Sequence, residues 1–242
     1  MTSPLLEVRS VSKHFGGFAA LSDVSLAVSP GERLGIIGPN GSGKTTLINC
    51  IAGALRSDAG SIAFRGADIT RLAPHRRARL GIARSFQVPR PFASMTLAEN
   101  VAVPLEYVTH RGALHTTDVR SEAETVLERM GLGGKAHVPA DSLTQIDLRK
   151  LELARAMAAC PSLLILDEVM AGLSPVEVDE VLGILFGVSG QGVTVIMIEH
   201  IMRAIMRFSE RVVCLDAGSI VAEGTPAQIA ADANVQKIYL GA

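Results

Sequence analysis

The stretch GPNGSGKT, residues 38–45, decides the fold of this chain. It matches the pattern G-x-x-x-x-G-K-[ST] in full, and it lies between an apolar strand predicted at 33–38 and a helix predicted at roughly 43–54. Glycines let the backbone wrap closely with its N–H groups pointing inward, and the helix N-terminus adds a dipole that favours anions. We therefore predict a phosphate-binding loop, against the alternative of a glycine-rich turn that only precedes a helix.

The residue types in this loop indicate separate tasks. Lys44 can reach the β and γ phosphates of a nucleotide, and the hydroxyl of Thr45 can bind Mg²⁺. The loop alone indicates an NTPase or a nucleotide kinase. The predicted nucleotide-binding residues in it are Gly38, Pro39, Asn40, Gly41, Ser42, Gly43, Lys44, Thr45 and Thr46.

Two further stretches place polar residues directly after apolar strands. SLLILDE, residues 162–168, ends in Asp167, which can support Mg²⁺, and Glu168 follows at once. A carboxylate at that position can orient or deprotonate an attacking water. MIEHIM, residues 197–202, brings His200 to the end of another strand, where it either faces the γ-phosphate or has a structural role.

Apolar strands and helices alternate at both ends of the chain. The strands predicted at 162–167 and 193–198 are apolar throughout, which indicates parallel strands covered on both faces. The middle of the chain is mostly helical, so we predict an α/β core with an inserted helical lobe. The predicted single domain spans 1–242, with a core lobe at about 1–87 and 159–242 and a helical lobe at about 88–158.

Local signals predict where several of these elements begin and end. Capping boxes predict helix starts at TLAE (96–99), SEAE (121–124) and SPVE (174–177). The charge-free run at 181–198 has the length of a membrane span, but SGQG, residues 189–192, predicts a loop that divides it into a helix end and a short strand. The stretch 107–118 is predicted to be an exposed connection.

Composition argues against several classes of protein. Apolar residues make up 48% of the 242, enough for a core, and a net charge of −1 provides no overall field toward nucleic acid. The three cysteines are widely spaced and form no CxxC, which argues against a disulfide framework or a zinc site. The stretch 69–98 holds six arginines and no acid. We interpret it as a solvated basic face; contact with a membrane partner is a further interpretation, and no nucleic-acid partner is expected.

Together these stretches resemble the ATP-binding subunit of an ABC transporter. GPNGSGKT and LLILDE resemble the two Walker motifs of that family, and His200 matches its switch histidine. SFQVPRPF supplies Gln87 at the position of the Q-loop glutamine, and AGLSP at 171–175 lies at the D-loop. HFGGFAAL puts Phe15 where the family has an aromatic residue that stacks on adenine.

The resemblance implies a fold and a set of roles. The fold class is α/β: a P-loop NTPase (RecA-like) core with an antiparallel β subdomain and an inserted α-helical subdomain. ATP and Mg²⁺ are the implied ligands. The implied catalytic residues are Glu168, His200 and Gln87, the implied metal residues are Thr45, Gln87 and Asp167, and Phe15 joins the nucleotide-binding set.

A closer likeness is to the subunits that power branched-chain amino acid importers. It rests on FGGFAAL, ARSFQ, MTLAENV, LELARA, DEVMAGL with IEHIMRAIM, and the tail EGTPAQIAADANVQKIYLG. This likeness implies a peripheral subunit on the cytoplasmic face of the inner membrane. Its implied partners are two membrane-spanning permease subunits, a second ATP-binding subunit (homologous or identical) and, through the complex, a substrate-binding protein.

Three other functions remain open at this stage. Importers of urea or short amides look similar to the branched-chain type. A soluble, non-transport ABC ATPase would act on nucleic acid or ribosomes, although such proteins usually carry two cassettes or long insertions. A nucleotide-binding regulator that does not hydrolyse is the last alternative, and the presence of Glu168 and His200 argues against it.

The stretch LTQID, at residues 143–147, falls where the family carries its Leu-Ser-Gly-Gly-Gln signature loop, which closes over the ATP of the partner subunit. Asp147 brings a negative charge close to the expected phosphate unless it points away, and loss of the glycines restricts the backbone. We interpret the stretch as a divergent signature loop rather than a plain helix cap. Its residues are Leu143, Thr144, Gln145, Ile146 and Asp147.

Overall fold

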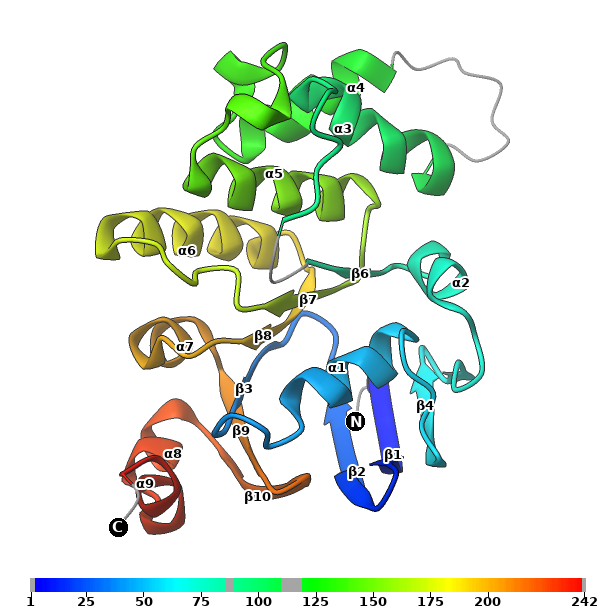
Figure 1. The fold of residues 1–242 in the computed structure, drawn as a ribbon, viewed down its shortest axis with the longest axis vertical. Helices are drawn as coiled ribbons and strands as arrows, with labels where there is room; N and C mark the ends of the chain where they lie inside the picture. The colour runs from blue at the N-terminus through cyan, green and yellow to red at the C-terminus, as the bar shows by residue number, and fades with distance from the viewer. Residues whose placement is uncertain (1–2, 86–88, 110–118, 241–242) are drawn as a thin grey trace.

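The computed structural model describes residues 3–85, 89–109 and 119–240. Within these ranges, a six-stranded sheet carries the predicted site (Figure 1). Five of its strands are parallel, and only β10 is antiparallel, against β9. In spatial order the strands are β10 (Ser219–Gly224), β9 (Arg211–Asp216), β3 (Arg33–Ile37), β8 (Thr194–Ile198), β7 (Leu163–Asp167) and β6 (Ile82–Arg84).

The parallel strands are apolar because both faces of this sheet are covered. In β7, Leu163 and Ile165 belong to a core shared with the second sheet, whereas Leu164 and Leu166 belong to a core shared with the helices. Successive side chains of a strand point to opposite faces, so a strand covered twice needs apolar residues at every position. The predicted α/β core is confirmed.

The second sheet is antiparallel and belongs to the N-terminal part of the chain. Helix α1 (Lys44–Ala52) packs between the two sheets through Leu47, Ile48 and Ile51, which are fully buried. The sheet therefore supports the helix that begins at the phosphate loop. Its strands within the described residues are, in order, β2 (Phe18–Val28), β1 (Leu6–Phe15), β4 (Ala59–Phe64) and β5 (Ala67–Asp68).

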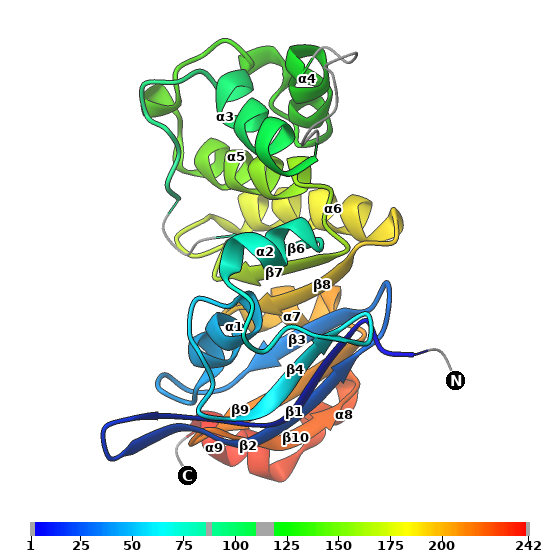
Figure 2. The same ribbon diagram turned by 90° about the vertical axis from the view of Figure 1, so that its right-hand side faces the viewer.

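Helices gather at the other end of the molecule (Figure 2). Their apolar core continues through α6 to the parallel sheet, so the helical end and the sheet share one buried cluster. The helical end contains α3 (Leu97–Pro104), the π-helix η1 (Leu105–Thr109), α4 (Val119–Arg129), the 3₁₀ turns η2 (Gly133–Lys135) and η3 (Ala140–Ser142), and α5 (Gln145–Ala158). The remaining helices are α2 (Pro74–Arg79), α6 (Pro175–Gly190), α7 (Met202–Phe208), α8 (Pro226–Ala231) and α9 (Ala233–Leu240).

Two of the three predicted capping boxes are confirmed. Thr96 and Ser174 cap α3 and α6, each accepting a hydrogen bond from the backbone N–H three residues later. The box predicted at SEAE is wrong, because α4 begins at Val119 and Ser121 already lies inside the helix. Val119 packs against the helical core, which favours the earlier start.

Two predicted loops differ from the structure at their ends. Helix α6 continues through Gly190, so the first half of the SGQG stretch is helical and the turn follows it. Residues 107–109 belong to the π-helix η1 rather than to an irregular connection, and residues 110–118 lie outside the described part of the chain. In both places, helical backbone hydrogen bonds extend past the polar signal in the sequence.

The interpretation of 69–98 as a solvated basic face is wrong for two of its arginines. Arg77 is 1% exposed, and its Nη1 donates hydrogen bonds of 2.7 Å to the carbonyl oxygens of both Cys50 and Ile51. These carbonyls belong to the last turn of α1, where the helix itself supplies no donors. Arg77 therefore stabilises the end of the helix that begins at the phosphate loop. Arg84, the second exception, pairs with Asp167.

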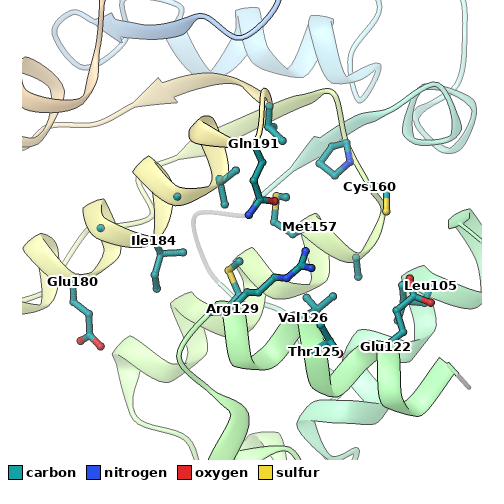
Figure 3. A pocket seen from close by; sticks show the side chains of 17 residues that line it. Leu105, Glu122, Thr125, Val126, Arg129, Met157, Cys160, Glu180, Ile184 and Gln191 are labelled. Carbon is teal, nitrogen blue, oxygen red and sulfur yellow. The ribbon is translucent and has the colours of Figure 1, made fainter.

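A hollow of about 750 Å³ lies between α4, the end of α5 and α6 (Figure 3). Arg129 enters it from α4, and Ile184 and Gln191 approach from the α6 side. Gly183 and Gly187 also line it, and a Cβ atom added at either position would meet nothing within 4 Å. Packing therefore does not require these helix-interior glycines.

Candidate active site

The phosphate loop connects β3 to α1 and depends on its glycines. Gly38 has a φ of 149° and Gly43 a φ of 103°. An added Cβ would lie 2.1 Å from the carbonyl oxygen of Leu215 at Gly38 and 2.5 Å from that of Ala20 at Gly43. Both contacts are too close for any side chain, so only glycine lets the loop pack this tightly against its neighbours.

Lys44 is folded back over the loop that precedes it. Its Nζ donates hydrogen bonds to the carbonyl oxygens of Gly38, at 2.8 Å, and Pro39, at 2.9 Å. Burial lowers the pKa of Lys44, while the carboxylates of Glu168 and Asp167 act in the opposite direction. The lysine thus lies within electrostatic reach of both predicted acids.

The rest of the loop mixes buried and accessible residues. The hydroxyl of Ser42 is buried and has no hydrogen-bond partner among the described residues. Gly41 has a φ of 79° with open space around it, so the turn itself requires this glycine. Asn40 and Thr45 are exposed, and Pro39 and Thr46 are half-buried. Accessible groups therefore alternate with buried anchors along the loop.

Asp167 ends β7 and is held by an arginine that the sequence did not identify. Its side chain is 3% exposed, and its Oδ2 lies 2.9 Å from Nη2 of Arg84, which comes from the neighbouring strand β6. Arg84 also donates to the side-chain carbonyl of Asn49 on α1. Burial raises the pKa of Asp167, and Arg84 opposes this effect. Arg84 thus joins the metal candidate to the helix of the phosphate loop.

Glu168 and His200 meet across adjacent strand ends. Oε1 of Glu168 lies 2.8 Å from Nε2 of His200. Glu168 has a φ of 51°, an unusual backbone conformation for a non-glycine residue, and its N–H donates to the carbonyl oxygen of Ile198 at 2.9 Å. Such strain persists only where the surrounding structure imposes it, and it is common at functional sites. The predicted base and the predicted switch histidine thus form one unit.

Glu199, a buried acid, directly precedes His200 in the sequence. Glu199 is 2% exposed, and its Oε1 accepts a hydrogen bond of 2.8 Å from the N–H of Met170. Burial raises the pKa of Glu199 to about 7, with a further contribution from the charge of Glu168. The backbone around Glu168 is thereby joined to the segment that carries His200. Sequence reasoning passed over Glu199, although an acid between an apolar strand and a candidate histidine was a visible signal.

The structure leaves the predicted roles of two site residues, Gln87 and Phe15, untested. Gln87 lies outside the described residues, so its roles in catalysis and at the metal stay predictions. Phe15 lies at the end of β1, where it is 50% exposed, and Nζ of Lys13 lies 5.6 Å from the centre of its ring. An exposed ring at a strand end is accessible for stacking, but its adenine contact also stays a prediction.

The predicted signature loop forms the start of α5. The hydroxyl of Thr144 caps the helix by accepting a hydrogen bond of 3.3 Å from the N–H of Asp147. Oδ2 of Asp147 in turn accepts from Thr144 Oγ1 at 2.7 Å and lies 2.5 Å from Nζ of Lys135. Burial alone would raise the pKa of Asp147, but these two partners outweigh it and hold the pKa below its usual value. The carboxylate of Asp147 therefore faces Thr144 and Lys135, and the positive charge of Lys135 compensates its negative charge.

The residues in the two glycine positions of the loop do not need unusual backbone angles. Gln145 and Ile146 are the first residues of α5 and have helical backbone. Nε2 of Gln145 donates a hydrogen bond of 3.2 Å to the carbonyl oxygen of Ala171, and Nη2 of Arg149 donates to the same oxygen at 3.3 Å. Leu143, just before the cap, packs against the helical core. The predicted signature loop is therefore joined to the stretch 171–175, the predicted D-loop, within this chain.

Most residues of α5, charged ones included, are buried. Arg149, Lys150 and Glu152 are buried along with the apolar positions. The helix lies between α3 and α4 on one side and α6 on the other (Figure 1), so little of its surface meets solvent. Nζ of Lys150 forms an ion pair with Glu180 of α6, whose Oε1 lies 2.5 Å away.

Comparison with known proteins identifies the family. A family model described as "ABC transporter" matches residues 21–171, and one described as "Branched-chain amino acid ATP-binding cassette transporter" matches residues 219–242. The chain belongs to the ABC transporter family. As an ATP-binding cassette of this family it is an ATPase. The high-affinity branched-chain amino acid transport ATP-binding protein LivG of Escherichia coli is 37% identical to it, over 100% of this chain and 99% of LivG.

Solved structures of cassettes from this family have the same fold. The ADP conformation of MJ1267, an ATP-binding cassette of an ABC transporter, matches with a TM-score of 0.89 and 31% identity, covering 100% of both chains. A dimeric post-hydrolysis state of the cassette MJ0796, bound to ADP and Pi, matches with a TM-score of 0.82 and 25% identity, over 91% of this chain and 98% of that one. The expected RecA-like core with its antiparallel and helical parts is confirmed.

The described residues lack two other kinds of feature. Among them no helix is both long and apolar enough to cross a bilayer. They also contain no group of three or more histidine, cysteine or acidic side chains that could hold a metal ion.

Proposed function

We propose that this chain is the ATP-hydrolysing subunit of an importer for branched-chain amino acids. The observation that carries the hydrolytic part is the contact between Glu168 and His200, 2.8 Å, within electrostatic reach of Lys44. The named relative LivG supports the choice of substrate. The proposed boundaries of the core lobe and helical lobe remain those predicted from the sequence.

The proposed reaction transfers the γ-phosphoryl group of ATP to water. The water oxygen bonds to the γ-phosphorus, the bond to the departing ADP oxygen breaks, and Glu168 accepts the proton. His200, through its hydrogen bond to Glu168, orients this carboxylate toward the water. Lys44 and the N–H groups of 40–46 bind the phosphates, Phe15 stacks on the adenine, and Gln87 contributes to catalysis.

Mg²⁺ fits the donor set of this site. Thr45 offers an accessible hydroxyl oxygen, and Asp167 offers a carboxylate at the end of β7. Mg²⁺ prefers oxygen ligands and usually takes one or two protein oxygens, with phosphate and water completing its shell. When bound, the ion neutralises charge on the phosphates. Asp167 must then share its carboxylate between the ion and Arg84.

We further propose that two cassettes close face to face, with Leu143, Thr144, Gln145, Ile146 and Asp147 covering the ATP of the partner. Neutralisation of Asp147 by Lys135 supports this role because it removes the charge that would repel a phosphate. The dimeric MJ0796 structure supports the assembly. The second subunit is either a copy of this chain or a homologue.

The membrane partners are proposed to dock beside the helical end. A largely apolar hollow of about 470 Å³ lies between α2, the end of α1, η1 and α5, with Ala52, His75 and Pro104 among its lining residues. Arg84 lines this hollow and forms an ion pair with Asp167. A segment docked in the hollow could therefore contact a residue that holds the proposed metal ligand. Two permease subunits at the cytoplasmic face of the inner membrane and, through the complex, a substrate-binding protein complete the proposal.

The hydrolytic proposal is tested with Glu168→Gln. Analytical ultracentrifugation with ATP and Mg²⁺ should detect a dimer of this variant, while steady-state ATP hydrolysis falls by about two to four orders of magnitude. Lys44→Ala is the control that should bind ATP poorly and stay monomeric. Unchanged hydrolysis in Glu168→Gln would contradict the role of Glu168. Uptake of leucine against urea by the assembled transporter in proteoliposomes tests the substrate.

A further inference from the structure

The C-terminal helix α9 places one side chain on the phosphate loop. The N–H of Gly38, the first residue of the loop, donates a hydrogen bond of 2.6 Å to the hydroxyl oxygen of Tyr239, 201 residues along the chain. We propose that Tyr239 is a positioning residue for the phosphate loop and thereby links the C-terminal helix to nucleotide binding. The inference rests on the proposed binding of phosphates by residues 38–45.

Tyr239 contacts the backbone at the first residue of the phosphate loop, Gly38. Its neighbours leave Gly38 little room, since an added Cβ would lie 2.1 Å from the carbonyl oxygen of Leu215. Gly38 is held on both sides: its carbonyl oxygen accepts from Nζ of Lys44 and its N–H donates to Tyr239. A buried N–H requires an acceptor, and Tyr239 supplies one.

The two bonds differ in what happens when phosphate arrives. Lys44 uses two of its donors on the carbonyl oxygens of Gly38 and Pro39. A lysine that turns toward a phosphate weakens these bonds, because its ammonium group has only three donors. The hydrogen bond to Tyr239 does not involve Lys44, so it can keep Gly38 in place while Lys44 moves from the loop carbonyls to the phosphate.

Helix α9 is anchored firmly enough for this task. Val235 is 4% exposed and joins the apolar core together with Ile229 of α8. Oδ1 of Asp232 accepts hydrogen bonds from the first turn of α9, at 2.8 Å from the N–H of Asn234 and 3.0 Å from that of Val235. Figure 1 shows both helices beside β9 and β10. The hydroxyl of Tyr239 therefore comes from a docked helix.

The tail that carries Tyr239 is matched by a family model separate from the one covering 21–171. Its residues 219–242 contribute β10, α8 and α9, and β10 is separated from β3 by β9. Contact with Gly38 gives this tail a role in the nucleotide site. Displacement of α9 would remove the acceptor from the loop entrance.

The composition of the chain allows a direct test. It has no tryptophan and only two tyrosines, so Tyr107→Phe leaves Tyr239 as the single tyrosine emitter. Tripolyphosphate with Mg²⁺ is a suitable probe, since it carries the phosphates of ATP without the absorbance of adenine. We expect titration with this probe to change the Tyr239 emission, and Lys44→Ala in the same background to abolish the change.

The second measurement removes only the hydroxyl. Tyr239→Phe should raise the Kd for tripolyphosphate, by calorimetry, and the KM for ATP about five- to tenfold, with a smaller change in kcat. Tyr107→Phe is the matched control and should leave both constants unchanged, because Tyr107 is exposed on η1. The same substitution is thus made at a residue that contacts the loop and at one that does not.

The outcomes separate this inference from the proposed function. Wild-type Kd and KM in Tyr239→Phe, with or without a lower melting temperature, would overturn the inference and leave the phosphate loop intact. Binding of tripolyphosphate that Lys44→Ala does not weaken would overturn the proposed phosphate site and this inference with it. A raised KM without a matching loss in melting temperature supports the positioning role.

Discussion

The ion pair at the start of α5 gives the sharpest prediction. Nζ of Lys135 lies 2.5 Å from Oδ2 of Asp147, and the two side chains are 47% and 7% exposed. Exposed pairs contribute about 0.2–1 kcal/mol, whereas removal of one partner of a buried pair costs about 3–5 kcal/mol. This pair is intermediate, and Thr144 still donates to the carboxylate at 2.7 Å. We expect Lys135→Met to lower the free energy of unfolding by about 1–2 kcal/mol.

A double-mutant cycle isolates this pair. Urea unfolding of Lys135→Met, Asp147→Asn and the double variant at neutral pH should give a coupling energy of about 1–2 kcal/mol. The lowered pKa of Asp147 means that its contribution is present above the ordinary carboxyl pKa and is lost as the pH falls through the lowered value. Lys237→Met, at an exposed lysine of α9, is the matched control and should change stability by less than about 0.5 kcal/mol. A coupling energy below about 0.3 kcal/mol would refute the reasoning.

The same substitution carries a functional consequence. Lys135→Met leaves the carboxylate of Asp147 without its cation at the helix end that is proposed to meet the phosphate of the partner. In a Glu168→Gln background, we expect the ATP-dependent dimer to weaken about tenfold in sedimentation experiments. Asp147→Asn removes the charge itself and should restore the dimer in the presence of Lys135→Met. A dimer insensitive to both changes would remove LTQID from the interface.

Three other substitutions test separate features. Arg77→Met should cost about 2–4 kcal/mol in urea unfolding, because the last carbonyl groups of α1 lose a buried donor; a loss under about 0.5 kcal/mol would contradict this account. Burial raises the pKa of Glu199 from 4.5 to about 7, so wild-type stability should fall as the pH rises through this interval. Glu199→Gln should flatten that profile, and an unchanged slope would argue against the shift. Gly183→Ala should raise the free energy of unfolding by about 0.4–1 kcal/mol, whereas a destabilised variant would show that the open space around this glycine is used.

The sequence predicts the centre of the site because topology fixes it. The phosphate loop, Asp167 and His200 each follow an apolar strand, and β3, β8 and β7 are neighbours in the sheet. Parallel neighbours end at the same edge, so residues that follow them must come together. The contact between Glu168 and His200 is therefore a consequence of strand order, which places β7 beside β8.

Contacts made by irregular or distant segments escape such reasoning. Arg84 reaches Asp167 from β6, 83 residues earlier, and nothing in their spacing announces the pair. Lys135 belongs to a single 3₁₀ turn that has no periodic pattern. Tyr239 reaches Gly38 only because α9 folds back beside β9 and β10. Each contact depends on tertiary geometry that neither propensity nor period encodes.

The divergent signature loop differs from the family pattern less than its letters suggest. Its acid is paired with Lys135, and its first two replacements, Gln145 and Ile146, occupy ordinary helical backbone, where positive φ is not needed. Their N–H groups begin a helix and so have no partner within it, which is the property that binds a phosphate. The real change is the side chain of Gln145, which is bonded to Ala171 of the D-loop. Where the family pattern has two glycines, this chain has a loop that is hydrogen-bonded to its neighbour, so the two loops should approach the ATP of a partner as one rigid surface.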